Sequence, residues 1–506
     1  MIRVGVGAAK LEFADGYGLY GYGPPGGRGY NAARGSAEFD QLSVKALYIE
    51  GPVGKLLIIT YDAAAGSRRL HAGIVRDLNA IAEQTFHDGE VWIVGTHTHA
   101  APGHYLGNLY DQFGQWPPGF REPVFTELRR KGLNAAMQAL SGPKQAKVGI
   151  VEEPVWLGAN RSLRPFLDNF SGVLSTWERE TAIGKAPAHL APEERAIDPR
   201  LRVIAFVGDN GESLASWASH SCHPATWPPA KWRPYHRDWP GVARDLVEQD
   251  VPFAMLNMGA NGDVTALPVG QVRIERPLER VRAIGEGIGQ AWRTAHQRAR
   301  EAARDVDFEL GFLRFVPNEW QLPRWDIGLQ VVCGAPEIDP GPVRRALRGY
   351  LKSQRRRGTQ GPKLSVLGPL TPIVSRLLGL NPSPEHPIGL LRLGTHLVFA
   401  SPFEQTTYAA YGIEQRLIAR WQAVRGETVT AGPLGLVGDY AGYMTTAAEY
   451  AHQYYEAAHT LYGVNQRDTL ARVWASMITG ESLGLSQRPP IDQRQLESFL
   501  PGFKGI

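Results

Sequence analysis

Four short segments of the sequence gather residue types that can hold a metal ion and move protons. They are residues 96–99 (THTH), 220–224 (HSCHP), 257–265 (NMGANGDVT) and 402–404 (PFE). Catalytic zinc typically takes three protein ligands from His and Asp/Glu and keeps one position for water. The histidines and carboxylates of these segments therefore predict a metal site of the zinc type.

One pair of these histidines, His97 and His99, is separated by a single residue. In a strand this spacing points both rings to the same side, because side chains alternate with a period of two. Two satisfied core histidines would have the same spacing. The small residues at 100–103 favour a metal ligand and an acid–base histidine, because a chelating side chain needs space around it. Cys222 is either a soft ligand or a small buried residue.

The elements that must position these segments are strand-like apolar runs. Helix-like periodic stretches alternate with them, and this alternation predicts the α/β class. In such folds the crevice beyond the carboxyl ends of the strands is the usual site. We expect strands at 55–62, 90–95, 200–207, 213–219 and 252–256 and two more within 389–400, and helices at 67–86 and 278–304.

Two stretches of the sequence favour irregular structure. Residues 16–35, rich in Gly and Tyr, predict a surface loop near the site. Residues 352–387 begin with a charge run that is typical of a solvated loop. Their apolar part, 364–380, is either part of that loop or a lid that faces lipid.

Composition narrows the class of protein further. The chain has 506 residues, 43% of them hydrophobic and 21% charged, which is close to a globular average and predicts a packed core. The net charge of +4 is spread along the chain, so no nucleic-acid partner is expected. Two cysteines exclude a disulfide scaffold. We see no transmembrane segment and no signal peptide at the start, so we expect a cytoplasmic protein, or a periplasmic or secreted one whose signal has been trimmed.

Six segments in a fixed order resemble the neutral ceramidase family, from Val4 to about Gly463. The longest match is the last one. The segments are GTHTHAAPGHY (95–105), NRS (160–162), SHSCHPATW (219–227), NGDVT (261–265), PFEQTT (402–407) and YAGYMTTAAEYAHQYYEAAHTLYG (440–463). The resemblance implies a catalytic domain of mixed β-sheets flanked by helices and a Zn²⁺ cofactor.

The resemblance also implies a role for each matching residue. The zinc ligands would be His97, His223, Glu404 and Tyr443. His99 would assist proton transfer, and Arg161 and Tyr455 would stabilise the polarised carbonyl. Thr265 would occupy the position of a family serine. From general zinc-site chemistry, Asp263 is either a carboxylate that orients a ligand histidine or only an Asx-turn residue.

Departures from the family pattern bear on the substrate. Thr265 adds a methyl group where the family has serine, and Phe403 replaces a glycine. Residues 312–387 do not resemble the family and are expected to be a divergent insert or lid, and 464–506 a C-terminal extension without the family's immunoglobulin-like domain. We therefore expect one large domain, 1–506, that prefers a smaller or more polar N-acyl compound than long-chain ceramide.

The function implied is hydrolysis of a linear amide by metal-activated water. The same site would serve an ester or lactone hydrolase or an acyltransferase, and these alternatives stay open. A non-catalytic binding protein would have lost the ligands, which are all present. A serine hydrolase is disfavoured because no Gly-x-Ser-x-Gly motif occurs.

Overall fold

The computed structural model describes residues 1–21, 41–180, 186–226, 234–266, 277–333, 335, 360–366, 381–480 and 483. The first half of the described chain contains β1 Ile2–Lys10, β2 Ser43–Gly51, β3 Gly54–Tyr61, α1 Arg68–Ile81, β4 Val91–Gly95, α2 Tyr110–Phe113, α3 Glu122–Leu140, β5 Lys144–Pro154, β6 Ala159–Asn160, α4 Leu163–Asp168, α5 Leu174–Glu180, α6 Pro192–Arg195, β7 Arg200–Val207, β8 Ser213–His220 and α7 Asp238–Val247. The second half contains β9 Ala254–Met258, β10 Val264–Thr265, α8 Pro277–Glu301, β11 Phe308–Phe315, β12 His386–Leu393, β13 His396–Ala400, β14 Glu404–Gln405, α11 Thr407–Arg425, β15 Thr430–Leu434, β16 Tyr443–Met444, α12 Ala447–His452, α13 Tyr455–Ala458 and α14 Gln466–Met477.

Two mixed sheets form the centre of the molecule. The larger has eight strands in the order β4-β3-β2-β1-β5-β7-β8-β9, and the smaller has four in the order β11-β12-β13-β15. Most neighbours are antiparallel, but β3 and β4, β8 and β9, and β13 and β15 run parallel. Parallel neighbours end at the same edge of a sheet, so polar segments that follow them are delivered close together.

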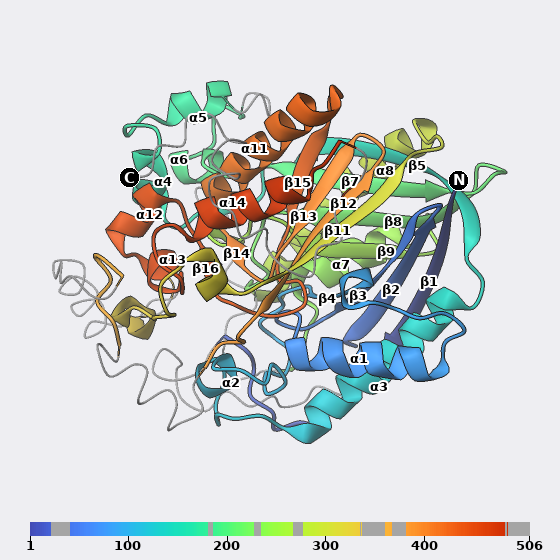
Figure 1. Cartoon of the computed structure of the whole chain (residues 1–506), viewed down its shortest axis with the longest axis horizontal. Helices are drawn as coiled ribbons and strands as arrows, with labels where there is room; N and C mark the ends of the chain where they lie inside the picture. Colours follow the sequence, from blue (N-terminus) through green and yellow to red (C-terminus); the bar gives the residue numbers. More distant parts are fainter. Residues whose placement is uncertain are drawn as a thin grey trace.

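The two sheets pack face to face between layers of helices. Along β3, Leu56 and Ile58 join a core cluster with residues of the smaller sheet, whereas Leu57 and Ile59 join the cluster under the helices. This alternation is the period of two expected of a strand that is buried on both faces. Helices α1 and α3 lie along one side of the larger sheet, and α11 and α14 lie over the smaller one (Figure 1). The predicted α/β class with mixed sheets flanked by helices is confirmed.

The ends of the larger sheet lie near each other. Its edge strand β9 contacts β3 and β4 at the opposite end of the strand order. Asn257 on β9 donates a hydrogen bond of 2.9 Å to the Thr60 hydroxyl on β3. The curl of the sheet therefore brings the segments after β4 and β8 together, although β4 and β8 are far apart in the strand order.

The predicted elements are found with small shifts at their ends. The hairpin of β7 and β8 and the pair β12 and β13 occur as expected. The predicted strand 252–256 is observed as β9, two residues later. The predicted helix 67–86 ends at Ile81 as α1, and Ser67 caps its start by accepting from the backbone N–H of Leu70.

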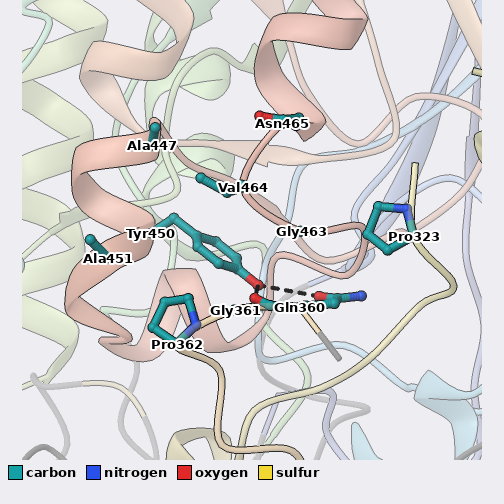
Figure 2. Close-up of a pocket in the computed structure, with 10 residues that line it drawn as sticks. All are labelled: Pro323, Gln360, Gly361, Pro362, Ala447, Tyr450, Ala451, Gly463, Val464 and Asn465. Carbon is teal, nitrogen blue, oxygen red and sulfur yellow. Dashed lines mark hydrogen bonds between the residues drawn. The ribbon is translucent and has the colours of Figure 1, made fainter. Parts of the chain in front are cut away.

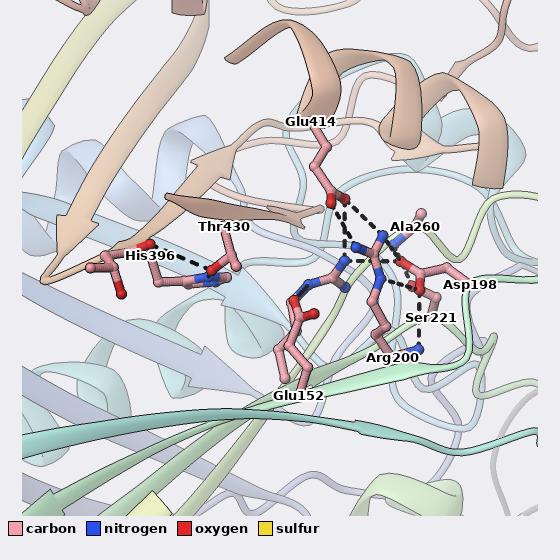
Figure 3. A network of polar contacts seen from close by, with 10 residues as sticks. Glu152, Asp198, Arg200, Ser221, Ala260, His396, Glu414 and Thr430 are labelled. Atoms are coloured by element: carbon pink, nitrogen blue, oxygen red, sulfur yellow. Dashed lines mark hydrogen bonds and ion pairs between the residues drawn. The ribbon is translucent and has the colours of Figure 1, made fainter. Parts of the chain in front are cut away.

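A buried cluster of ion pairs joins α11 to the larger sheet. Arg200 on β7 donates to Glu414 on α11 at 2.6 and 2.8 Å, and to Asp198 at 2.8 and 3.1 Å. Arg202 donates to the same two carboxylates at 3.0 and 3.4 Å. The carboxylates of Asp198 and Glu414 flank the Arg200 guanidinium from opposite sides (Figure 3). We call these four residues the ion-pair cluster.

The expected insert and extension are partly described. Within 312–387, β11 belongs to the smaller sheet. The apolar stretch 364–380, expected to be part of a loop or a lid, lies outside the described residues from 367 onward. At the start of 464–506, α14 packs against α11, and the Trp474 indole donates to the Gly389 carbonyl at 2.9 Å. No helix in the described part of the chain is long and apolar enough to span a membrane.

Candidate metal centre

Three imidazole rings converge where the polar segments meet. The Nε2 atom of His97 lies 3.0 Å from that of His223 and 3.3 Å from that of His99. The remaining separation, between the Nε2 atoms of His223 and His99, is 3.2 Å. Glu404 completes the group, with its Oε1 atom 3.3 Å from His97 Nε2. Three of the four predicted ligands are thus together, and His99 is as close to them as they are to each other.

The other ring nitrogen of two of these histidines fixes where their protons lie. His97 Nδ1 is 2.6 Å from the carbonyl oxygen of Ala64, and His223 Nδ1 is 3.1 Å from that of Asn261. A carbonyl only accepts, so both Nδ1 atoms carry hydrogen and both Nε2 atoms offer lone pairs in the neutral rings. Two lone pairs facing each other at 3.0 Å repel, and a cation between them removes the repulsion. The donor set therefore fits a bound metal ion.

The convergence of His97 and His99 was predicted, but the strand periodicity given as its reason is wrong. Strand β4 ends at Gly95, before the first histidine. The backbone at His97 is left-handed, with φ of 64°. Such a conformation is uncommon for a non-glycine residue and often marks a functional site. The turn after the strand, and not the pleat, therefore aims His97 at its partners.

The segment after β8 is held by the strands that follow it. The backbone N–H of His223 donates to the Val264 carbonyl at 3.0 Å, and His223 forms a bridge with Thr265. Thr265 is buried in β10, which pairs with β6. The structure thus places Thr265 in the frame of the site, and its predicted role as the family serine stays a prediction.

The expectation that Asp263 orients a ligand histidine is wrong. Its carboxylate accepts hydrogen bonds of 2.8 Å from the Asn160 amide and from both the backbone N–H and the hydroxyl of Thr407. The carbonyls of Ala64 and Asn261 take the place that was expected for it. Sequence patterns missed these carbonyls because any residue type can supply one. Asp263 instead ties β6 and β10 to the start of α11.

The predicted ligand Tyr443 lies beside Glu404. The two residues are register partners of the parallel strands β14 and β16. The Tyr443 hydroxyl accepts a hydrogen bond of 3.1 Å from Arg161 Nη2. Glu404 has a second tyrosine neighbour that the sequence reading missed, because the Tyr440 hydroxyl donates to its Oε1 atom at 2.6 Å. Tyr440 was within the quoted motif, so only its role was overlooked.

Arg161 and Tyr455 also reach this side of the site. The Arg161 guanidinium carbon lies 5.4 Å from the centre of the Tyr455 ring, and Nη2 donates to the Gly262 carbonyl at 2.6 Å. The Tyr455 ring packs edge-on against Tyr443, with centroids 5.7 Å apart. The three motifs that supplied these residues therefore meet in space.

The protonation states in the site suit metal binding. Burial lowers the pKa of His223 to about 3, and burial followed by the neighbouring His97 and His223 lowers that of His99 well below its usual value. Burial alone would raise the pKa of Glu404, but the His97 and His223 imidazoles hold it below its usual value. Neutral imidazole and ionised carboxylate are the forms in which these side chains bind metals.

The surroundings of the imidazoles are tightly packed. Gly21 lies so close to His99 that a Cβ atom there would come within 2.1 Å of Nδ1. The described end of the predicted loop 16–35 is therefore near the site, and residues 22–35 lie outside the described residues. Cys222 is buried and free, and burial raises its pKa, which suits the small buried residue rather than the soft ligand.

A separate cleft of about 350 Å³ opens beside α12. Within the cleft, the Tyr450 hydroxyl points toward Gln360 and donates a hydrogen bond to its side-chain oxygen (Figure 2). None of the nine predicted site residues lines it. The residues that line it are Pro323, Gln360, Gly361, Pro362, Ala447, Tyr450, Ala451, Gly463, Val464 and Asn465.

Comparison with known proteins points to one family. The model of the neutral/alkaline non-lysosomal ceramidase N-terminal region matches residues 41–252 and 342–472. The second match includes part of the segment that was expected to diverge, 312–387. It also extends into α14, beyond the end of the quoted motifs at Gly463.

Individual relatives agree with the family model. The chain is 24% identical to a neutral ceramidase of Pseudomonas aeruginosa over 87% of its own length and 66% of the relative, just under two thirds. It is 22% identical to a neutral ceramidase of Mycobacterium tuberculosis over 97% of its own length and 79% of the relative. A solved structure titled "Ceramidase complexed with C2" superposes with a TM-score of 0.72 at 19% identity, covering 97% of this chain and 78% of that one. The crystal structure of the Pseudomonas aeruginosa neutral ceramidase gives a TM-score of 0.69, also at 19% identity, over 97% and 76% of the two chains.

Proposed function

Because the chain belongs to the neutral/alkaline non-lysosomal ceramidase family, we propose that it is a zinc-dependent hydrolase of N-acyl compounds. The bond cleaved is the amide, as the name of its relatives, neutral ceramidase, indicates for them. The observation that carries the proposal is the pair of unprotonated Nε2 atoms of His97 and His223, 3.0 Å apart beside Glu404. The substrate class is N-acyl compounds, of which lipid-like amides such as ceramide are one option.

The donor set supports zinc as the metal. Zinc is commonly held by imidazole nitrogen and carboxylate oxygen. Two nitrogen ligands about 2.0–2.1 Å from one tetrahedral zinc ion lie roughly 3.3 Å apart. The Nε2 atoms of the two proposed histidine ligands, His97 and His223, are 3.0 Å apart. His97, His223 and Glu404 would hold the ion, and Tyr443, the register partner of Glu404, would be the fourth ligand.

When bound, zinc supplies a Lewis acid that polarises the scissile carbonyl and lowers the pKa of a bound water to about 7. The chain's own residues do the rest. Hydrogen bonds from Nη2 to the Gly262 carbonyl and the Tyr443 hydroxyl fix the Arg161 guanidinium beside the metal centre, where the group can donate to the carbonyl oxygen of a bound substrate. A preorganised donor of this kind contributes about 3 kcal/mol to transition-state stabilisation.

His99 completes the proposal as the group that passes a proton to the leaving amine. Its ring is edge-on to His97 with centroids 4.8 Å apart, and Tyr20 lies against it with centroids 6.1 Å apart. A histidine is the side chain most often used for such transfers near neutral pH. Asp263 is left in a framework role, since its carboxylate is occupied by Asn160 and Thr407.

The test is a substrate and metal experiment on one preparation. The protein is purified without added metal, its metal content is measured by mass spectrometry, and an N-acyl amide and the matching ester are offered to it. We expect about one zinc per chain, hydrolysis of the amide, and loss of activity in a chelator that added zinc restores. A metal-free protein that is fully active in chelator would contradict the proposal.

The alternative reaction on the same site is cleavage of an ester or lactone, or acyl transfer. The donors described above act on any polarised carbonyl, so the geometry serves these reactions equally. Hydrolysis of the ester with no cleavage of the amide would select this alternative. Transfer of the acyl group to an added amine, measured by chromatography of the products, would select the acyltransferase.

A further inference from the structure

The carboxylate of Glu456 lies against Arg161 and has no role in the reaction described so far. Arg161 Nε donates to its Oε1 atom at 2.8 Å, and the Ser162 hydroxyl donates to its Oε2 atom at 2.7 Å. The Arg161 and Glu456 side chains are only 3% and 4% exposed. We infer that Glu456 is a positioning residue that orients the Arg161 guanidinium toward the reacting carbonyl, an inference that rests on the proposed hydrolase function.

The geometry of the guanidinium explains why one carboxylate can set its direction. A guanidinium is planar, so fixing Nε and one terminal nitrogen fixes the direction of the whole group. Glu456 holds Nε, and the Gly262 carbonyl holds Nη2 at 2.6 Å. With both anchors in place, Nη2 also reaches the Tyr443 hydroxyl at 3.1 Å. Loss of the carboxylate removes the charged anchor at Nε, one of the two contacts that set the plane of the group.

The same carboxylate joins two parts of the chain that are far apart in sequence. Arg161 and Ser162 follow β6, whereas Glu456 lies in α13 beside Tyr455. The two carboxylate oxygens of Glu456 accept hydrogen bonds from the neighbouring residues Arg161 and Ser162. The contact therefore also sets the distance between this segment and α13. Because both charges are buried, removal of either leaves the other without its ion-pair partner.

The substitution Glu456→Gln tests the inference, since it keeps the shape of the side chain and removes its charge. We expect kcat on the N-acyl amide to fall about tenfold or more, with KM nearly unchanged and zinc content equal to wild type. Removing a transition-state donor outright costs about a hundredfold or more, so misdirecting one should cost less. Glu194→Gln is the matched control, because Glu194 is also buried but accepts from the backbone of Ala191.

The decisive measurement is the same substitution in an Arg161→Ala background. If Glu456 acts through Arg161, Glu456→Gln has no further effect on kcat there. An equal fall in both backgrounds, or wild-type kcat in the single variant, would overturn the inference and leave Glu456 a structural residue.

Urea unfolding of the same four proteins gives a readout that needs no substrate. The double variant should unfold at a urea concentration no lower than the less stable single variant, because the buried charges are removed together. If the loss of stability in the double variant equals the sum of the losses in the two single variants, Glu456 and Arg161 are not coupled. This result would overturn the inference without any knowledge of the substrate. If wild type cleaves no amide or ester, the proposed function fails, whereas the coupling between Glu456 and Arg161 is still measured.

Discussion

The protein buries two groups of ionisable side chains, and they differ in how their polar atoms are satisfied. In the ion-pair cluster, Arg200 donates to both Asp198 and Glu414 through four hydrogen bonds of 2.6–3.1 Å. Among the described residues only Nη1 of Arg202 is left without a partner there. In the metal centre, unprotonated nitrogens face each other, and the Oε2 atom of Glu404 has no hydrogen-bond partner within the described part of the chain.

The difference separates a group that serves the fold from one that serves a ligand. Burying a charge is costly unless another group of the protein neutralises it, and the ion-pair cluster does this by itself. Among the described residues, no cationic side chain lies between the facing Nε2 atoms of His97 and His223. The energetic balance of the metal centre therefore depends on a group from outside the chain, so substitutions there should change binding and rate rather than folding.

The largest effect expected is on the metal centre. His97→Ala and Glu404→Ala should remove bound zinc and lower activity by more than a hundredfold, because even partners of metal ligands cost about 10–100-fold when lost. Metal analysis and amide hydrolysis measure both effects. The control is His296→Ala, because His296 is buried with its nitrogens 2.9 and 3.0 Å from the Ser213 and Ser216 hydroxyls. Zinc loss in His296→Ala would show that removal of a buried histidine outside the metal centre also releases the metal. The distinction between the metal centre and the rest of the protein would then fail.

A smaller effect of a different kind is expected in the ion-pair cluster. Glu414→Gln should lower the free energy of unfolding by about 3–5 kcal/mol, because Arg200 and Arg202 lose a buried counter-ion. Urea denaturation measures this loss, and kcat and zinc content per folded molecule should stay at the wild-type values. Glu50→Gln is the control, since it breaks a largely exposed pair with Arg3 and should cost under about 1 kcal/mol. A loss of zinc in Glu414→Gln would show that the two groups are not independent.

The role of His99 sharpens the comparison inside the metal centre itself. We expect His99→Ala to keep about one zinc per chain and to lose about a hundredfold in rate, the lower end for a lost acid–base group. The Nε2 atom of His99 lies 3.3 and 3.2 Å from those of His97 and His223, close enough for His99 to be a ligand itself. The zinc content of His99→Ala therefore distinguishes the two roles. Equal zinc loss in the His97 and His99 variants would make His99 a ligand.

Much of this site could be predicted because its chemistry depends on residue type. The apolar runs before residues 96–99 and 220–224 indicated strands, and His97, His223 and Glu404 met as expected. A family resemblance added Arg161, Tyr443 and Tyr455, for which spacing alone gave no signal. The meeting of His97, His223 and Glu404 was predictable because strand ends and the ligand preferences of metals are visible in sequence.

The rest depends on backbone that the sequence does not display. The left-handed turn at His97 and the carbonyl of Ala64 could not be read from side chains. Asp263 was assigned to a histidine because carboxylates often orient ligands, whereas strand pairing placed it beside Asn160 and Thr407. Glu456 was passed over because its partner, Arg161, is 295 residues away.

The smallest effect expected concerns the acyl chain of the substrate. Each buried methylene contributes about 0.8 kcal/mol to binding, so a closed lipid tunnel gives a steep rise of kcat/KM with chain length. We expect a flat or falling series, because residues 312–341 lie outside the part of the chain that the family model matches. The measurement is kcat/KM for one amine carrying acyl chains of graded length, with His97→Ala as the blank.

A second experiment tests whether the acyl chain binds in the cleft beside α12. The substitution Ala451→Trp fills part of this cleft with a large side chain, and none of the predicted site residues lines the cleft. A severalfold rise per added pair of methylenes that Ala451→Trp abolishes would place the acyl chain in that cleft and restore long-chain ceramide as the preferred substrate. A flat series unaffected by the substitution would restrict recognition to the groups around Arg161 and the metal centre.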